Sequence, residues 1–362
     1  MKIQITFILN LLFLVFLLVQ FSCSSINTLP QINKIKNFSY FSNDQFYDLE
    51  KITIGFGSCL KQDRPMPIFS SIKNDSLDLF FMIGDNVYGD TERRDLYELK
   101  MAYKRQMDNF NLLNLEFPIE AIWDDHDYGR NDGGRDYPYK QSSKELFLEF
   151  WNVSKDDIRW TRPGIYHELL VDIGDKALQL LFLDTRTFRD PLLPTDEIGG
   201  IGKERYLPHE DNALTILGTT QWDWLEEKMR KSVDYRIIVS SIQFLALGHG
   251  WEAWNNFPYE RERMIDLLDQ SPSEHILFIS GDRHRGGLYQ LRTGNGKMIS
   301  EMTSSSLNAS FPNKEEPGPL RVGSTFVEEN YGVIIIDNVK NIMSVHLKNK
   351  NGNILQSLLI EN

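Results

Sequence analysis

The sequence is poor in several features that would assign it to a specialised class. Its 362 residues include only two cysteines, too few for the disulfide framework of a small secreted domain. Basic residues are also in deficit, because 39 Lys and Arg stand against 51 Asp and Glu, a formal net charge of −12. Non-specific binding to nucleic acid depends on Lys and Arg, so we expect no stable nucleic-acid binding. A hydrophobic content of 41% is instead typical of a globular protein with a large core.

The N-terminal hydrophobic run, Leu11 to Val19, is only nine residues long. That is too short to span a bilayer but suits the apolar part of a signal peptide. The following Gln20-Phe21-Ser22-Cys23 resembles a bacterial lipoprotein signal in which Cys23 is the lipidated first mature residue. We predict a signal peptide over 1–22, a polar tether over 23–50 and a bacterial membrane lipoprotein facing the periplasm or the cell surface. The alternative is an ordinary cleaved signal and a periplasmic or secreted protein.

Short apolar runs that end abruptly in polar residues recur along the rest of the chain. Their length and their content of Ile, Val, Leu and Phe favour buried strands. Segments with helical spacing and charge lie between them, and this alternation predicts an α/β fold. Six runs show the pattern: Ile52–Phe56, Leu77–Ile83, Ile119–Trp123, Leu178–Leu183, Ile237–Ile242 and Ile276–Ser280. The predicted helices are Arg93–Asp108, Ser142–Trp151, Thr219–Lys231 and Pro258–Asp269.

The C-terminal part predicts a meander of strands with turns at Asn295-Gly296 and Asn351-Gly352. We therefore expect one domain over 51–362 in which two sheets pack together between helices. In open α/β sheets, functional groups gather beyond the carboxyl ends of the strands. Three segments rich in Gly, Pro and charge are predicted to form loops at that rim: 135–140, 191–211 and 309–324.

The polar groups at these strand ends include several acidic residues that are adjacent in the sequence. Asp124-Asp125-His126-Asp127 places three carboxylates and an imidazole in four residues, and such a crowd is unfavourable unless something positive lies among it. If Cys23 carries lipid, Cys59 is a solitary thiol, which is either buried and inert or a metal ligand. Carboxylates, imidazole and a thiolate together favour a mixed metal site over a structural zinc site.

The order of the motifs resembles the PhoD-like alkaline phosphatases, which are calcineurin-like metallophosphatases. The resemblance covers about 52–336 and rests on an ordered set of segments rather than on any single one. These segments are Gly57-Ser58-Cys59, Gly84-Asp85-Asn86-Val87-Tyr88-Gly89-Asp90, Trp123-Asp124-Asp125-His126-Asp127, Leu183-Asp184-Thr185-Arg186, Trp254 to Pro258 with Arg261-Glu262-Arg263, and Gly281-Asp282-Arg283-His284.

The resemblance implies a four-layer α/β/β/α sandwich with two packed mixed sheets and a centre of two metal ions, Fe³⁺ and Ca²⁺, although other divalent metals are possible. It implies that Cys59 and Tyr88 bind the iron and that Asp85 bridges both metals. Asp125, Asp282 and His284 are then ligands of the second metal. Thiolate and phenolate donors favour a trivalent iron, and a carboxylate-rich half favours calcium.

The same resemblance implies the catalytic groups. His126 would protonate the leaving oxygen, and Asp127 would hold its ring. Arg186 is a candidate phosphate clamp that could equally pair with Asp184. Gln243 lies near a motif that usually supplies a histidine, and His249 is a competing choice for that position.

We thus expect an exported phosphoesterase that hydrolyses phosphomonoesters, phosphodiesters or both, using a hydroxide activated by two metals. Its substrate would be a phosphate-ester small molecule or a lipid, and a lipid anchor would hold the protein at a membrane. The first alternative is a phosphodiesterase of phospholipids or glycerophosphodiesters. The second is a ligand-binding surface lipoprotein without turnover. The sequence leaves the oligomeric state open.

Overall fold

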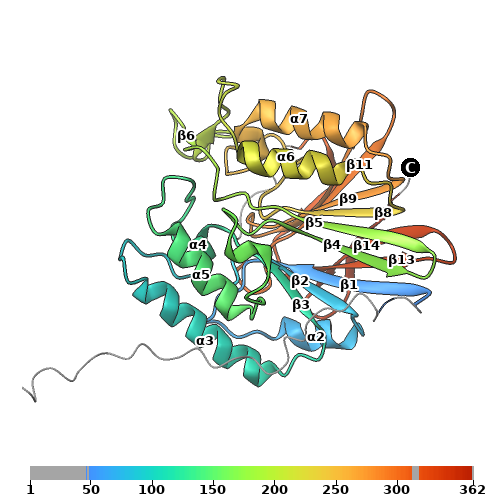
Figure 1. Cartoon of the computed structure of the whole chain (residues 1–362), viewed down its shortest axis with the longest axis horizontal. Helices are drawn as coiled ribbons and strands as arrows, with labels where there is room; N and C mark the ends of the chain where they lie inside the picture. Colours follow the sequence, from blue (N-terminus) through green and yellow to red (C-terminus); the bar gives the residue numbers. More distant parts are fainter. Residues whose placement is uncertain (1–45, 47–48, 312–317, 361–362) are drawn as a thin grey trace, which may run out of the picture. The chain divides into compact units, whose positions relative to one another are not determined.

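Figure 1 shows the computed structural model, which describes Phe46, residues 49–311 and residues 318–360. The predicted signal peptide, Cys23 and nearly all of the predicted tether lie outside the described residues. Within the described part of the chain, no helix combines the length and the apolar character needed to cross a membrane.

The first sheet has six strands in the order β15-β14-β13-β1-β2-β3. Its parallel half consists of β1, β2 and β3, and β1 also pairs antiparallel with β13. The remaining strands, β13 to β15, form the antiparallel meander that the sequence predicts. The bounds are β1 Lys51–Gly57, β2 Leu79–Ile83, β3 Ile119–Ile122, β13 Asn330–Asp337, β14 Ile342–Asn349 and β15 Ile354–Ile360.

The second sheet has seven strands in the order β12-β10-β11-β9-β8-β5-β4. Its central strands β5, β8, β9 and β11 are parallel, and antiparallel strands flank them on both sides. The bounds are β4 His167–Ile173, β5 Lys176–Phe182, β8 Tyr235–Val239, β9 His275–Ser280, β10 Gly286–Arg292, β11 Met298–Ser304 and β12 Arg321–Phe326. Both sheets are therefore mixed, as predicted.

Helices cover the outer face of each sheet (Figure 1). The helices α2, α3 and α5 lie beside the first sheet, and α6 and α7 lie beside the second. The predicted four-layer α/β/β/α sandwich is confirmed. The bounds are α2 Ile68–Asn74, α3 Tyr97–Leu113, α4 Asp125–Tyr128, α5 Lys140–Phe150, α6 Gly218–Met229 and α7 Pro258–Asp269, with 3₁₀ turns at Ile158–Trp160 and Trp254–Asn256.

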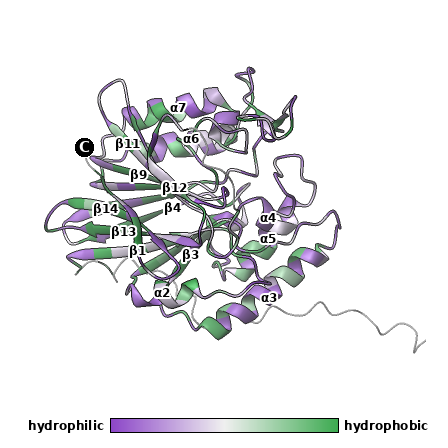
Figure 2. Ribbon diagram, turned by 180° about the vertical axis from the view of Figure 1, so that it is seen from behind, coloured by the Kyte–Doolittle hydropathy of each residue, from purple (hydrophilic) through white to green (hydrophobic). Residues whose placement is uncertain are grey.

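Each long helix buries one apolar stripe. In α3 the buried residues include Leu99, Tyr103, Met107 and Phe110, and their spacing of three or four places them on one face. A corresponding core between the second sheet and α6 and α7 contains Trp222, fully packed at 1% exposure. Figure 2 shows hydrophobic residues along the strands and mixed faces along the outer helices.

Several elements differ from the sequence prediction. The strands β4, β11 and β12 are not predicted, and β12 occupies part of the predicted loop 309–324. The predicted loop 191–211 contains the short hairpin β6 Leu193–Pro194 and β7 Tyr206–Leu207. The strand predicted to reach Ile242 ends at Val239. The sequence pattern predicts Gly287–Leu291 as the first strand of the C-terminal meander, but this segment forms β10 of the second sheet, apart from β13–β15 of the first.

Candidate metal centre

The candidate site lies where strands of both sheets end. Cys59 follows β1, Asp85 follows β2, Asp125 follows β3, and Asp282 follows β9. Backbone hydrogen bonds hold these ends together, because the Cys59 amide donates to the Gly84 carbonyl at 3.3 Å. The two sheets also meet there through the bridge between Ser58 and Ser305. The fold thus brings predicted ligands from distant sequence positions to one rim.

Four of the predicted ligands have a left-handed backbone. Their φ angles are 59° at Cys59, 51° at Asp85, 65° at Asp282 and 53° at His284. Residues other than glycine seldom adopt this conformation. A left-handed residue breaks the extended backbone of the strand, so the alternation of side chains along the strand ends before these residues.

Cys59, Asp85 and His284 form a first group of potential ligands whose donor atoms all lie within 4.8 Å of one another. The thiol Sγ of Cys59 lies 3.3 Å from Asp85 Oδ2, and the Tyr88 hydroxyl donates to the same oxygen at 3.1 Å. The Nδ1 atom of His284 bonds to the Ala309 carbonyl, which leaves Nε2 as the nitrogen available to the group. Tyr88 therefore adjoins the cluster through Asp85.

Burial controls the protonation of this first group. It raises the pKa of the Cys59 thiol, and the adjacent Asp85 carboxylate raises it further. The pKa of the Tyr88 hydroxyl is raised by the same two causes. Thiolate and phenolate forms therefore require a compensating cation, which a metal ion would supply.

Asp124, Asp125 and Asp282 form a second group within 4.8 Å, and Asp85, Asp125 and His126 form a third. Asp85 and Asp125 thus each belong to two groups. Within the described part of the chain, the buried Oδ2 of Asp124 has no hydrogen-bond partner. Burial raises the pKa of Asp282, and the neighbouring carboxylates of Asp124 and Asp125 raise it further. An unsatisfied buried oxygen among carboxylates fits a bound cation.

The grouping differs from the predicted distribution in one respect. The prediction places His284 with Asp125 and Asp282 on the second metal, whereas the structure groups His284 with Cys59 and Asp85. Asp124, which received no role, joins Asp125 and Asp282 instead. Asp282 and His284 are only two residues apart in the chain but belong to different groups, and both have a left-handed backbone.

The ring of His126 is held by Asp90, and the predicted contact with Asp127 is not present. His126 Nδ1 lies 2.6 Å from Asp90 Oδ2. The Asp127 carboxylate instead accepts hydrogen bonds from the backbone amides of Asn86 and Asp124, both at 3.0 Å. Asp127 thus fixes the loops that carry the ligands. Asp90 closes the quoted run Gly84–Asp90, but nothing in its spacing predicts this contact.

The charge of His126 follows from its neighbours. Burial lowers the pKa of the imidazole, but the carboxylates of Asp125 and Asp85, together with the hydrogen bond that Nδ1 donates to Asp90, raise it to about 11. The protonated imidazole is therefore the stable form in this acidic surrounding. A proton on His126 suits the predicted role as a donor to a leaving oxygen.

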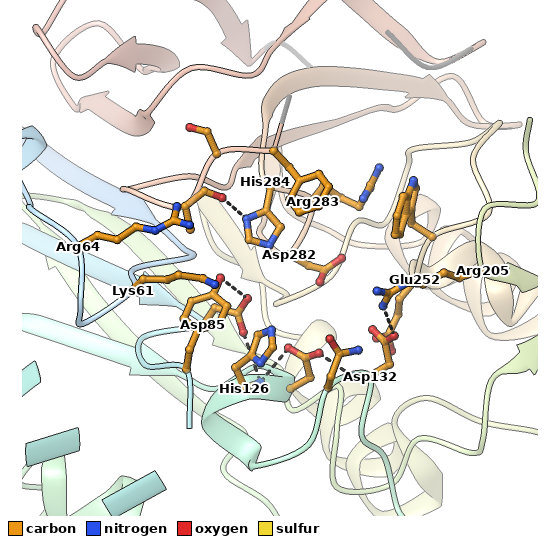
Figure 3. A pocket seen from close by; sticks show the side chains of 17 residues that line it. Lys61, Arg64, Asp85, His126, Asp132, Arg205, Glu252, Asp282, Arg283 and His284 are labelled. Atoms are coloured by element: carbon orange, nitrogen blue, oxygen red, sulfur yellow. Dashed lines mark hydrogen bonds and ion pairs between the residues drawn. The ribbon is translucent and has the colours of Figure 1, made fainter. Parts of the chain in front are cut away.

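Six of these residues form the floor of a cavity of about 390 Å³ (Figure 3): Asp85, Tyr88, Asp125, His126, Asp282 and His284. Among the residues without a predicted role, Lys61, Arg64, Arg205 and Phe311 form part of its walls. The full lining is Lys61, Arg64, Asp85, Tyr88, Asp125, His126, Asn131, Asp132, Arg205, Trp251, Glu252, Asp282, Arg283, His284, Ala309, Ser310 and Phe311. Sequence reasoning missed the wall residues because they come from loops with no motif.

Comparison with known proteins now identifies the family. The family model described as PhoD-like phosphatase matches residues 54–352. The chain belongs to the PhoD-like phosphatase family. Alkaline phosphatase D of Bacillus subtilis (strain 168) is 22% identical, over 66% of this chain and 46% of its own length. The chain thus spans about half the length of that curated relative.

Solved structures agree on the fold. The "Structure of PhoD" superposes with a TM-score of 0.65 at 16% identity, covering 87% of this chain and 73% of the other. Purple acid phosphatase PPD1 of yellow lupin (Lupinus luteus) gives 0.58 at 12% identity, over 89% and 55% of the two chains. GAP50 of Plasmodium, described as an anchor in the inner membrane complex, gives 0.56 at 13% identity, over 86% and 89%. This PhoD-like chain therefore has the metallophosphatase fold.

Arg186 of this PhoD-like chain does not contact the cavity. Its side chain is fully buried, with Nη2 2.5 Å from Asp124 Oδ1 and Nη1 2.7 Å from Glu252 Oε2. The contact to Asp184 comes from the Arg186 backbone amide, at 3.0 Å. Neither predicted side-chain role, phosphate clamp or partner of Asp184, agrees with this geometry. The guanidinium instead positions Asp124.

Gln243 and His249 bond to each other, and neither side chain lines the cavity. His249 Nε2 lies 3.1 Å from Gln243 Oε1, and Gln243 Nε2 donates to Thr303 Oγ1 at 2.9 Å. Burial lowers the pKa of His249 well below its usual range, and the charges of Arg283 and Arg285 lower it further. Both predicted alternatives for this position therefore form a neutral buried pair outside the three ligand groups.

Proposed function

We propose that this PhoD-like protein is a metal-dependent phosphoesterase that hydrolyses phosphomonoesters, phosphodiesters or both. The observation that carries the proposal is the proximity of two potential metal-ligand groups, Cys59-Asp85-His284 and Asp124-Asp125-Asp282. Their shared edge is formed by Asp85 and Asp125, whose carboxylates lie within 4.8 Å of each other at the floor of one cavity. Such an arrangement suits two neighbouring metal ions. We propose Fe³⁺ beside Cys59, Tyr88 and His284, and Ca²⁺ beside Asp124 and Asp282, because these donor sets match the preferences of the two ions.

When bound, the two ions would bind phosphoryl oxygens and lower the pKa of water. The chain itself supplies the proton for the leaving oxygen. His126 lines the cavity, and its Nδ1 is engaged by Asp90, so Nε2 is the atom available to donate. Asp90 orients the ring, and Asp127 keeps the two ligand loops in place through its backbone contacts.

Export is part of the proposal and rests on the sequence alone. The apolar run that ends at Gln20-Phe21-Ser22-Cys23 supports cleavage before Cys23 and a lipid anchor on that residue. A phosphoesterase at this location would act on phosphate esters outside the cytoplasm. Mass spectrometry of the purified mature protein tests this part separately, because a lipidated N-terminal Cys23 has a characteristic added mass.

Catalysis is tested by metal content and turnover. Elemental mass spectrometry of the purified protein is expected to find about one iron and one calcium. Turnover of 4-nitrophenyl phosphate or its bis ester should be lost after chelation and in the variants Cys59→Ala and Asp85→Asn. Asp108→Asn on the exposed face of α3 makes the same chemical change away from the site and should retain activity. Folded protein that binds no metal and releases no nitrophenol would refute the proposal and favour a binding lipoprotein.

A further inference from the structure

Two cations on one wall of the cavity have no carboxylate partner in the described part of the chain. Lys61 Nζ lies 4.4 Å from the centroid of the Tyr88 ring, and Arg64 Nη1 donates to the Asn308 carbonyl at 3.2 Å. Both side chains line the cavity, and Figure 3 shows them on the same side of it. This wall therefore carries two uncompensated positive charges.

The opposite wall differs in its charge balance. Arg205 Nη1 lies 2.7 Å from Asp132 Oδ2, so that cation is compensated. Glu252 is likewise paired with Arg186 at 2.7 Å and with Arg189 at 2.9 Å. Figure 3 shows Asp132, Arg205 and Glu252 together, across the cavity from Lys61 and Arg64. The cavity is thus electrostatically asymmetric.

The acidic floor does not account for the free cations. Asp124 already has Arg186 as its partner, and the remaining ligand groups fit metal ions. In a chain of net charge −12, two unpaired cations at a cavity wall are suited to attract an anion from solution.

Hydrogen bonds hold this cationic wall in a fixed conformation. The Asn308 side chain accepts from the Lys61 amide at 2.7 Å and donates to the Lys61 carbonyl at 2.9 Å. The Arg64 amide closes a turn onto the Lys61 carbonyl at 3.2 Å. Gln62, between them, bonds through its side chain to the backbone amide and carbonyl of Tyr88, both at 2.9 Å. Little ordering of the backbone is then needed when an anion binds.

We propose that Lys61 and Arg64 form a second anion-binding subsite. It selects phosphate esters whose non-reacting part carries its own anionic group, a carboxylate or a second phosphate. The inference rests on the proposed function, in which the metal ions at the floor bind the reacting phosphoryl group. The two cations are then specificity-determining residues, and they contact the leaving or retained part of the substrate.

Matched substrates test this subsite. Phenyl phosphate serves as the reference, 4-carboxyphenyl phosphate adds a carboxylate, and 1,4-phenylene bisphosphate adds a second phosphate. For the metal-loaded wild-type protein, kcat/KM for at least one charged probe should exceed that of phenyl phosphate by about tenfold, the effect of one or two charge-assisted contacts. In Lys61→Met/Arg64→Met that preference should disappear, while kcat/KM for phenyl phosphate stays within about twofold.

Arg105→Met supplies the control, because it removes one exposed cation from α3 that does not line the cavity. It should keep the preference, and so should the charge-conserving single variant Lys61→Arg. The two probes also identify whether the subsite accepts carboxylate or phosphate. Equal kcat/KM for all three substrates, or a preference that survives in the double variant, would overturn the inference.

Two further outcomes are distinct. If the double variant loses activity equally on all three substrates, the cations bind the reacting phosphoryl group and the second subsite is refuted. If the metal-loaded wild type releases no phosphate from any substrate, the proposed function fails before the subsite is at issue.

Discussion

Arg186 offers the sharpest test of how the site is supported. Its guanidinium lies between Asp124 at 2.5 Å and Glu252 at 2.7 Å, and all three side chains are at most 2% exposed. Burial raises the pKa of Asp124 to about 7, and the charge of Arg186 opposes that increase. Substituting Arg186→Met would leave two buried carboxylates with less compensation, although Glu252 would keep Arg189.

Removing one partner of a buried ion pair costs about 3–5 kcal/mol of the free energy of unfolding. For a domain of this size, 1 kcal/mol corresponds to about 2 °C in Tm, so Arg186→Met should lower Tm by roughly 6–10 °C. The Tm of Arg186→Lys should lie between those of Arg186→Met and the wild type. A lysine ammonium keeps the charge but cannot bond to both carboxylates in the planar geometry of a guanidinium.

The assay is urea unfolding followed by tryptophan fluorescence, carried out with chelator and again with metal. A supporting role predicts a stability loss in both conditions. A double-mutant cycle with Glu252→Gln should give a coupling free energy above about 1 kcal/mol. Wild-type stability in Arg186→Met, combined with weaker binding of inorganic phosphate, would refute this reasoning and restore the phosphate clamp.

Two other predictions concern individual carboxylates. Asp90→Asn should lower kcat about tenfold. It should also move the alkaline limb of the pH–rate profile to lower pH, because Asp90 helps to raise the pKa of His126. A pH–rate profile that is moved by Asp127→Asn but not by Asp90→Asn would contradict the assignment of Asp90. Glu120 has its pKa lowered to about 2 although burial opposes this, because Arg159 lies 2.9 Å away and His167 3.1 Å away. Since the folded-state pKa lies below the ordinary value, this stabilisation is complete above about pH 4.5 and is lost as the pH falls through about 2. Glu120→Gln should therefore lower the free energy of unfolding at pH 7 by about 2–3 kcal/mol. Urea unfolding should show that this difference from wild type shrinks between pH 5 and pH 2. Equal stability of the two proteins at pH 7 would contradict the prediction.

The parts of the fold that the sequence predicts correctly have a strong local signal. Strands such as β2, with five buried residues in succession, read as strands because burial on both faces demands a continuous apolar run. Strand β11 is also buried, but three of its residues are polar. Their hydrogen-bond partners lie on other segments: Ser300 accepts from Gln290 on β10, Glu301 accepts from the Phe244 amide, and Thr303 bonds to Ser280 on β9. Sequence analysis does not predict such a strand, because its buried polar residues find their hydrogen-bond partners only in the folded structure.

The same limit applies to the candidate site. Residues that follow a strand directly, such as Cys59 and Asp85, could be predicted because parallel strands end at one rim. Contacts made across the fold could not. Arg186 meets Asp124 and Glu252, which are 62 and 66 residues away in the chain. The family resemblance implied Asp127 as the partner of His126, but the Asp127 carboxylate instead accepts a hydrogen bond from the backbone amide of Asn86.

The left-handed residues at the strand ends have a consequence for engineering. Each of Cys59, Asp85, Asp282 and His284 holds a backbone conformation that costs a non-glycine residue roughly 1–2 kcal/mol. Glycine adopts it freely, so a Gly substitution at any of the four would relieve local strain while it removes a potential ligand. Selection for thermostability alone would therefore favour inactive variants at these positions. A stabilisation campaign on this protein must hold the four residues fixed, because here the trade-off between stability and activity is built into the main chain.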